Sequence, residues 1–562
     1  RTHVVWYPGS GAAPTVVSLL VPLVPSSAEL AAAALEGGAV AEQSHDRVLG
    51  VAQATADHPA VGWALDPLLV VGSDAEETPT SSTDALASPP AEGAGDGEAG
   101  DAEDPARDTG DGTDGASQPD VTDLGQVLAP LAQGREIVAL TYADVDDGAT
   151  VHADRLDLLD AAGEIGRETF GAAGLTSLPG VVWPAAQAPD LDTARAHAER
   201  GASSLILPDP ALPLRQELTF TPTGRGTVTA GGASVSALLA EEALSVALGG
   251  ARPAGDERVE ADDLGARQHL LALTAMITRE RPSDGRHVLA VARRTFDGDA
   301  AALRERISAL AAAPWAHLAP LSDLLERPDP GFDRVAPRAV VREDGEADSS
   351  LLEQVVAAQA SLEAFATIVA EPELLAREER RRLLQVASAA WRVDPAGRQA
   401  FANVSRAAAA DVQKRVGVIA TGTVNLISEV GDLPVSVRNG LDQEMTAQLR
   451  LTPDGPSILL GDAVPVVVPA ESESTIGVRV NAVGSADVEI LAVLTDASGQ
   501  VVGDAATLLV RVRADWENIG TAVIAAFVAA ALILGLVRNI RRSPRRGDAV
   551  PPEAPPEEVA RT

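Results

Sequence analysis

The chain has 562 residues, of which 46% are hydrophobic, and its formal net charge is −37. This length and apolar content predict several domains with their own cores and exclude a chain that is disordered throughout. The acidic balance excludes nucleic acid as a partner, because phosphate binding needs concentrated lysine and arginine. The absence of cysteine excludes disulfides, thiolate nucleophiles and cysteine-based metal centres.

Residues 1–340 repeat a short β-branched run that ends in proline or aspartate, followed by an Ala/Leu-rich helical pattern. This alternation specifies a parallel sheet covered by helices. We predict a β/α barrel-like domain of about six to eight strands, with an open doubly wound sheet as the alternative. The expected strands lie in Val16–Pro25, Val61–Pro67, Ile137–Asp146, Val181–Ala185, Leu205–Pro210 and Val288–Arg293. The expected helices are Ser27–Glu36, Val121–Gln133, Leu191–Arg200, Val235–Ala247, Asp262–Arg279 and Ala300–Ala312.

Residues 73–120 interrupt this pattern with an acidic segment of Asp, Glu, Gly, Ser, Thr, Pro and Ala that has almost no large apolar residue. Such a segment cannot bury enough surface to offset the entropy of ordering it. Because folded segments flank it, we predict a disordered surface insertion within the barrel-like domain.

Two further segments follow the barrel-like domain. Residues 345–412 keep a helical period throughout, which predicts a helical segment. Residues 416–513 contain about seven or eight alternating runs separated by Asn-Gly, Asp-Gly and Ser-Gly turns. That pattern predicts an immunoglobulin-like β-sandwich.

Ile519–Val537 is an unbroken apolar run that would span roughly 28 Å as a helix, close to the thickness of a bilayer. Acidic residues precede it, and arginines cluster after it at 538, 541, 542, 545 and 546. The positive-inside rule therefore predicts a single-pass plasma-membrane protein with an extracytoplasmic N-terminal bulk and a disordered cytoplasmic tail at 538–562. Because Arg1 is not a methionine and the N-terminus must be exported, we expect that a signal peptide has been removed.

Motifs for nucleotide binding and common hydrolase chemistry are absent. GSGAAPT at Gly9–Thr15 lacks the Gly-Lys-Ser/Thr of a phosphate-binding loop, and there is no Gly-x-Ser-x-Gly, Ser-x-x-Lys or His-Glu-x-x-His. The eight histidines include no pair at helical ligand spacing. We predict neither a metal nor a cofactor.

The best candidates for chemistry are aspartates at the ends of expected strands: Asp66 in WALDP, Asp144 and Asp146 in TYADVD, and Asp209 in LPDP. β/α barrels place their active sites at this edge, and glycoside hydrolysis uses two carboxylates about 5–10 Å apart. These four are the candidate catalytic residues. The alternative is that each aspartate caps a helix or forms an Asx turn. Rings at the same strand ends could stack on a sugar, and these candidate ligand-binding residues are Trp63, Tyr142 and Trp183.

The order of several short motifs resembles a known family. These motifs are WALDPLLV, IVALTYADVD, a WPA turn, SAAWR at Ser388–Arg392, LPVSVRNGL before the all-β segment, and an apolar helix with an arginine-rich tail. The resemblance is to an uncharacterised actinobacterial family of single-pass envelope proteins, commonly encoded beside the MviN/MurJ-type lipid II flippase. It implies an extracytoplasmic location and a link to peptidoglycan assembly, and it carries over no catalytic residues. The barrel-like half resembles polysaccharide deacetylases and related glycosidases, but the chain lacks the paired His-x-x-x-His ligands of the deacetylases.

Three functions remain open from the sequence. We expect a non-enzymatic component of cell-envelope assembly that binds cell-wall glycan or a membrane protein such as the flippase. The alternative is a carbohydrate-active hydrolase that uses the strand-end aspartates. A third reading is a catalytically inactive barrel that retains its sugar cleft as a sensor.

Overall fold

The computed structural model describes residues 4–7, 9, 11–36, 39–71, 124–186, 189–230, 232–254, 257–260, 263–294, 296–420, 422–426, 428–513 and 516–541. The acidic insertion predicted at 73–120 and most of the predicted tail lie outside these residues. The chain forms two compact units, residues 1–361 with 376–410 and residues 362–375 with 411–562. Each unit is described by itself.

A nearly closed parallel sheet forms the centre of the first unit. Its strands follow the ring in chain order, from β1 through β2 to β3 and from β4 through β5, β7 and β10 back to β1. This order confirms a barrel-like sheet and excludes the open doubly wound alternative. The strands are β1 (Thr15–Leu23), β2 (Gly62–Leu65), β3 (Ile137–Ala139), β4 (Val181–Val182), β5 (Ser204–Pro208), β7 (Ala233–Ala240) and β10 (His287–Val291). In addition, β11 (Ala316–Leu318) pairs with β1, and β6 (Arg225–Ala230) pairs antiparallel with β7.

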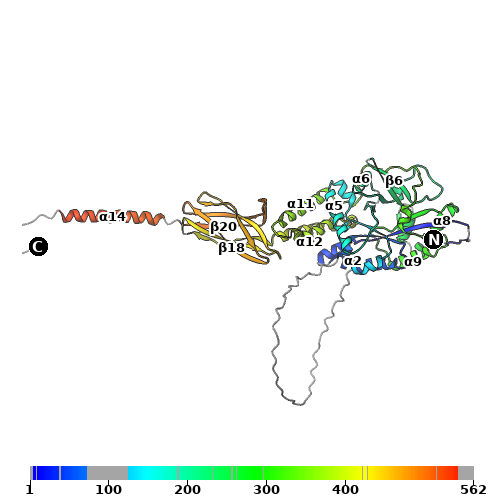
Figure 1. The fold of residues 1–562 in the computed structure, drawn as a ribbon, viewed down its shortest axis with the longest axis horizontal. Helices are drawn as coiled ribbons and strands as arrows, with labels where there is room; N and C mark the ends of the chain where they lie inside the picture. Colours follow the sequence, from blue (N-terminus) through cyan, green and yellow to red (C-terminus); the bar gives the residue numbers. More distant parts are fainter. Residues whose placement is uncertain are drawn as a thin grey trace, which may run out of the picture. The chain divides into compact units, whose positions relative to one another are not determined.

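Helices connect these strands and cover the sheet; α2 and α9, for example, lie side by side (Figure 1). The helices are α1 (Ser27–Glu36), α2 (Val40–Ala54), α3 (Leu124–Ala132), α4 (Asp147–His152), α5 (Leu156–Ala172), α6 (Leu191–Glu199), α7 (Glu242–Leu248), α8 (Asp263–Glu280), α9 (Ala300–Ala311) and α10 (Leu321–Leu325). Short 3-10 turns follow three strands: η1 (Pro67–Val70), η2 (Tyr142–Asp144) and η3 (Asp209–Ala211). A hairpin joins β8 (Ala251–Ala254) to β9 (Glu257–Glu260).

The helix predicted at Val235–Ala247 is wrong over its first half. Residues up to Ala240 belong to β7, which pairs with β5 and β6, and α7 begins only at Glu242. Alanine and leucine favour a helix in isolation. Here Leu239 packs outside the barrel and Leu238 packs inside it, so burial on both faces outweighs the local preference.

Strand side chains alternate between two apolar cores. Along β1, Leu20 packs inside the barrel with Ile206 and Leu289. Its neighbours Leu19 and Val21 pack outside, against the covering helices. Because successive side chains of a strand point to opposite faces, both cores follow from one continuous apolar run.

The ring is incomplete between β3 and β4, which have only three and two residues. No ladder joins these two strands in the described part of the chain. The amide of Leu178 donates to the carbonyl of Ile137 at 2.8 Å across this junction. We call the junction the seam.

The predicted helical segment contains α11 (Ser349–Ala366), α12 (Pro372–Gln385), η4 (Ala389–Val393) and α13 (Pro395–Gln413). Trp391 of the SAAWR motif is fully buried, with its ring centroid 5.3 Å from that of Phe401. The same apolar cluster includes Tyr142 and Leu158, so within the first unit this segment packs against η2 and α5.

The second unit contains a nine-stranded sheet among its described residues, in the order β16-β18-β14-β12-β20-β19-β15-β17, with β13 on β20. Buried and exposed side chains alternate along its strands, as in β14 and β19. The immunoglobulin-like arrangement stays a prediction. The strands are β12 (Val416–Ile419), β13 (Val424–Leu426), β14 (Val430–Asn439), β15 (Met445–Pro453), β16 (Ile458–Leu460), β17 (Val464–Val468), β18 (Ser472–Ala482), β19 (Ala486–Thr495) and β20 (Val501–Val512).

Helix α14 (Trp516–Ile540) contains the apolar run of the C-terminal region. Within it, Thr521–Ile540 has a mean hydropathy of 2.3 and is long and apolar enough to cross a membrane. This span begins and ends a few residues later than the predicted 519–537.

Candidate functional site

Charged side chains gather just beyond the carboxyl ends of the barrel strands. Asp66 follows β2, Asp144 follows β3, and Asp209 follows β5. Glu241 and Arg294 follow β7 and β10 in the same way. The topology therefore brings these residues to the edge where barrel enzymes place their sites.

Asp66 is fully buried and lies beneath this edge. Its Oδ1 accepts hydrogen bonds from the amides of Leu68 and Ala143, both at 2.9 Å. Asp66 therefore caps η1, which is the capping role that the sequence analysis gave as the alternative to catalysis. Its Oδ2 has no hydrogen-bond partner among the described residues. Burial and the nearby charge of Asp144 raise the pKa of Asp66 well above its usual range, which favours the neutral acid.

The turn that presents Asp144 is strained. Ala143 and Asp144 have φ angles of 59° and 45°, a left-handed conformation that is uncommon outside glycine. The Asp66 carboxyl holds the amide of Ala143, and the carbonyl of Thr141 accepts the amide of Asp144 at 2.8 Å. Such strain persists only where the surroundings fix it, often at functional sites. Asp66 thus helps to position the Asp144 carboxyl.

Arg294 joins both sides of the seam. Its Nη1 donates to the two carboxylate oxygens of Asp144 at 2.7 and 3.0 Å. Its Nη2 donates to the carbonyls of Trp183 and Pro184 at 2.6 and 2.9 Å, and the guanidinium lies 4.2 Å from the centroid of the Trp183 ring. Burial raises the pKa of Asp144 to about 6, although Arg294 opposes this shift.

Asp146 serves a different ion pair. Its two oxygens accept Nε and Nη2 of Arg392, both at 2.7 Å, and Oδ1 also caps α4 through the amide of Ala149. Arg392 also pairs with Glu343. Asp146 is fully buried, and its oxygens are engaged in structural contacts.

Asp147, the next residue, connects α4, the loop after β4, and α6. Its Oδ1 accepts the amides of Gly148 and Ala185 at 2.8 and 3.0 Å, and its Oδ2 lies 2.6 Å from Nε2 of His197. Burial opposes ionisation, but the hydrogen bond with His197 and the other contacts lower the pKa of Asp147 below its usual value.

His152 sits between two carboxylates. Its Nδ1 lies 2.8 Å from Glu346 and its Nε2 lies 2.7 Å from Asp190, which caps α6 through the amide of Thr193. Burial opposes protonation, but both carboxylates favour it, so the pKa of His152 is raised.

A cavity of about 560 Å³ lies at the seam, between the ends of β3 and β4 and the helices α5 and α6. We call it the seam cavity. One part of its lining is apolar and includes Leu159, Phe170, Leu175 and the half-buried Trp183. Its charged and polar lining includes Asp144, Asp147, Asp160, Arg167, His197 and Arg200.

Helix α5 presents glycines to this cavity, among them Gly163, Gly166 and Gly171. A Cβ added at Gly163 or Gly171 would meet no atom within 4 Å, so space lies open beside both. At Gly166 it would approach Pro67 Cγ at 3.2 Å and the amide of Tyr142 at 3.3 Å. Each glycine inside a helix costs about 1 kcal/mol relative to alanine, so the open cavity comes at the expense of stability.

Asp209 lies apart from the seam cavity. It lines a separate cavity of about 230 Å³ together with Glu241. The residues before them, Pro208 and Ala240, are partners in adjacent strands, which explains why the two carboxyls are neighbours. Burial raises the pKa of Asp209 to about 6 and that of Glu241 to about 7.

The three predicted aromatic residues also lie in different surroundings. Trp63 is fully buried, with its indole N–H donating to Thr55 Oγ1 at 3.0 Å, and Tyr142 is 2% exposed. Both rings are buried, which does not favour stacking on a sugar. For these two residues ligand binding stays a prediction. Trp183 lines the seam cavity.

The structure brings two of the predicted residues, Asp144 and Trp183, to one cavity. The sequence analysis did not select the other charged residues around them. Asp147 follows the predicted Asp146 directly, and Arg294 follows the end of a predicted strand, so the rule that selected the aspartates could have included both. His197 and Arg167 carry no comparable local signal. Among the described residues, no group of three or more His, Asp or Glu side chains is placed to hold a metal ion.

Comparison with known proteins gives a family and several distant structural likenesses. The family model described as "Family of unknown function (DUF6049)" matches residues 1–558. No curated relative matches the chain significantly. The α-amylase AmyC from Thermotoga maritima is 8% identical, with 71% of this chain and 93% of that chain covered and a TM-score of 0.42. The 4-alpha-glucanotransferase from Thermococcus litoralis is 13% identical, with 67% and 55% covered and a TM-score of 0.37. A protein described as a polysaccharide deacetylase from Mycobacterium smegmatis is 14% identical, with 61% and 98% covered and a TM-score of 0.35. At these values the structural likenesses carry no argument about activity.

Proposed function

Since the chain belongs to the family of unknown function DUF6049, we propose its function from the geometry of the seam cavity: a membrane-anchored protein that binds a saccharide there without cleaving it. The observation that carries this proposal is the cavity itself. It has the volume of a small-molecule site and combines the half-buried Trp183 ring with charged and polar side chains. A sugar presents apolar C–H faces and hydroxyl edges, and this lining offers partners for both.

The carboxylates at the site support binding over catalysis. Both carboxylate oxygens of Asp144 accept hydrogen bonds from Arg294, and both oxygens of Asp147 also have hydrogen-bond partners. Asp66 and Asp146 act as caps, and Asp146 is also paired with Arg392. Glycoside hydrolysis needs two carboxyls free to reach the scissile bond or a water, whereas these groups hold the seam together.

Helix α14 supports a membrane anchor, and the arginines after it support a cytoplasmic C-terminus. The first unit with its seam cavity would then lie outside the plasma membrane, where cell-wall glycan is abundant. A cell-wall glycan as ligand and the lipid II flippase as neighbour stay proposals. Because the chain has no cysteine, Glu473→Cys and Ser543→Cys each introduce a unique label. A membrane-impermeant maleimide should label the first variant on intact cells and the second only after lysis; the reverse pattern would contradict this orientation.

Binding is tested with the full chain in nanodiscs and the disaccharides N,N′-diacetylchitobiose and N-acetylglucosaminyl-N-acetylmuramic acid. Calorimetry should show saturable binding without release of monosaccharide. Trp183→Ala should abolish binding by removing the ring, and Gly163→Leu should abolish it by filling the cavity. Arg195→Gln, on α6 outside the cavity lining, is the matched control and should bind as the wild type does. No saturable binding of either disaccharide would sink the proposal.

A second candidate, a hydrolase, is favoured by one observation. Asp144 and Asp147 line the same cavity, and burial raises the pKa of the first while the contacts of the second lower its pKa. Environments that push two carboxyl pKa values apart are typical of an acid and base pair. Reducing-end release by the wild type that disappears in both Asp144→Asn and Asp147→Asn would replace the binding proposal.

A further inference from the structure

The charges around the seam cavity are paired with one exception. Asp144 forms an ion pair with Arg294, Asp160 forms one with Arg200, and Asp147 Oδ2 lies 2.6 Å from Nε2 of His197. Arg167 also lines the cavity, is exposed, and makes no ion pair with any described residue. Arg167 is therefore the lining arginine without an ion-pair partner among the described residues.

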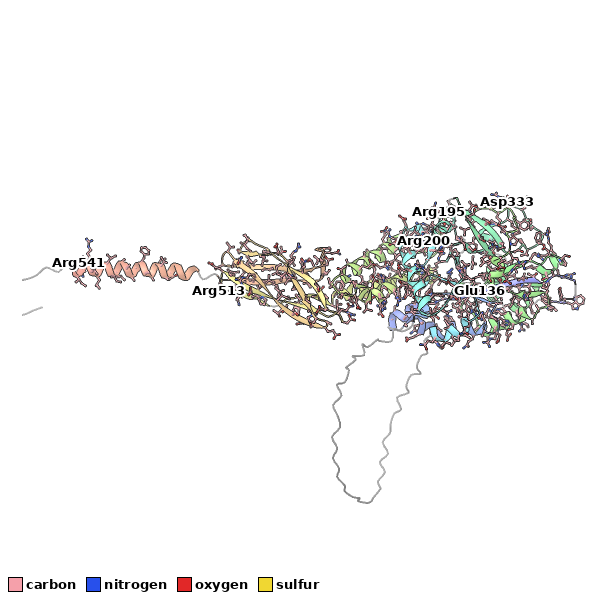
Figure 2. All side chains as sticks on the ribbon, in the orientation of Figure 1. Glu136, Arg195, Arg200, Asp333, Arg513 and Arg541 are labelled. Carbon is pink, nitrogen blue, oxygen red and sulfur yellow. The ribbon has the colours of Figure 1, made fainter. Side chains whose placement is uncertain are left out.

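A second arginine, Arg200, lines the same cavity. Arg167 lies seven residues after Asp160 on α5, two helical turns along the same face. Arg200, labelled in Figure 2 at the end of α6, donates through Nε and Nη2 to the two oxygens of Asp160 at 2.6 and 3.0 Å. Both arginines line the cavity, and Asp160 pairs with Arg200 and not with Arg167.

We infer that the seam cavity takes a saccharide that bears a carboxylate or phosphate, and that Arg167 receives this anion. The inference rests on the proposed function and names its ligand class. An arginine fork matches both anions because it offers two parallel N–H donors. In a chain with a net charge of −37, an anionic ligand is repelled at long range, so a local unpaired cation is what makes its binding selective.

The test compares ligands that differ by one anionic group. N-acetylglucosaminyl-N-acetylmuramic acid is compared with diacetylchitobiose for a carboxylate, and N-acetylglucosamine 6-phosphate with N-acetylglucosamine for a phosphate. The full chain in nanodiscs should prefer at least one anionic member by about tenfold at low salt, and this preference should shrink as salt is raised. A preference in the first pair identifies a carboxylate as the bound group, and a preference in the second pair identifies a phosphate.

Arg167→Gln should reduce the preference for the anionic member over the neutral member to less than about twofold. Arg195→Gln, which removes an exposed arginine outside the cavity lining, should keep the preference. Equal binding of neutral and anionic members by the wild type, or an unchanged preference in Arg167→Gln, overturns this inference and leaves saccharide binding standing. Absence of binding by all four ligands overturns both.

Discussion

Replacing Arg294 by methionine tests whether the seam depends on this one side chain. The change keeps much of the apolar stem but removes every donor to Asp144 and to the carbonyls of Trp183 and Pro184. The Arg294 and Asp144 side chains are 8% and 7% exposed, so solvent replaces these bonds poorly. Breaking a buried pair by removing one partner costs about 3–5 kcal/mol.

The ionisation of Asp144 sets a definite share of this loss. An ordinary aspartate has a pKa of about 3.9 and each unit is worth about 1.4 kcal/mol, so a pKa of about 6 means that ionised Asp144 already costs about 3 kcal/mol at pH 7. Without Arg294 the pKa of Asp144 rises further, and the cost increases toward its upper limit, the roughly 4 kcal/mol needed to protonate the group at pH 7. The cost at Asp144 therefore rises by up to about 1.5 kcal/mol when Arg294 is removed, and this share of the destabilisation is assigned to the ion pair. The rest of the destabilisation is assigned to the carbonyls of Trp183 and Pro184, which lose their donor.

The pH dependence follows from the sign of this shift. The pKa of Asp144 is raised on folding, so its contribution to stability is fully present below about pH 3.9 and is lost as pH rises through about 6 in the wild type. In Arg294→Met the loss extends to higher pH. The ionisation share of the variant's destabilisation should therefore be near zero at pH 5 and about 1.5 kcal/mol at pH 7.

Urea unfolding followed by tryptophan fluorescence measures this loss, because five of the six tryptophans lie in the first unit. The double variant Asp144→Asn/Arg294→Met should recover up to about 4 kcal/mol relative to Arg294→Met at pH 7, because asparagine has no carboxyl to protonate. A loss below about 1 kcal/mol, or equal losses at pH 5 and pH 7 with no recovery in the double variant, would refute the reasoning.

Three further predictions use the same unfolding assay. Gly163→Ala should stabilise the first unit by about 0.5–1 kcal/mol, because open space surrounds the new methyl group, while the matched Gly166→Ala should destabilise it against Pro67; the opposite order would contradict the open cavity. Asp66→Asn keeps the Oδ1 acceptor, and because the pKa of Asp66 is raised, the variant should gain stability relative to the wild type as pH rises from about 4; a pH-independent difference would exclude a buried neutral acid. The pKa of His152 is raised on folding, so its contribution to folding stability is fully present below about pH 6.5 and is lost as pH rises through the folded pKa. His152→Gln should therefore destabilise the first unit most at low pH. A loss of stability that grows with pH would contradict this account.

The sequence alone determined most strands of the barrel and the edge of the site, although it missed β7. A continuous apolar run followed by proline or aspartate is enough to mark a buried parallel strand and its carboxyl end, so Asp66, Asp144 and Asp209 were all placed at strand ends. The apolar length of α14 was equally visible, because bilayer thickness fixes a residue count. These properties are periodic or local, and neighbouring residues encode them.

Only the tertiary structure decided which of these carboxyls share a cavity and what each one does. Asp144 meets Arg294 150 positions away, and Asp146 meets Arg392 246 positions away. Asp144 and Asp147 line the seam cavity, whereas Asp209 lines another. The reason is physical: the order of strands around the ring and the failure of β3 to pair with β4 set these partnerships, and both depend on the packing of the whole barrel rather than on any local pattern.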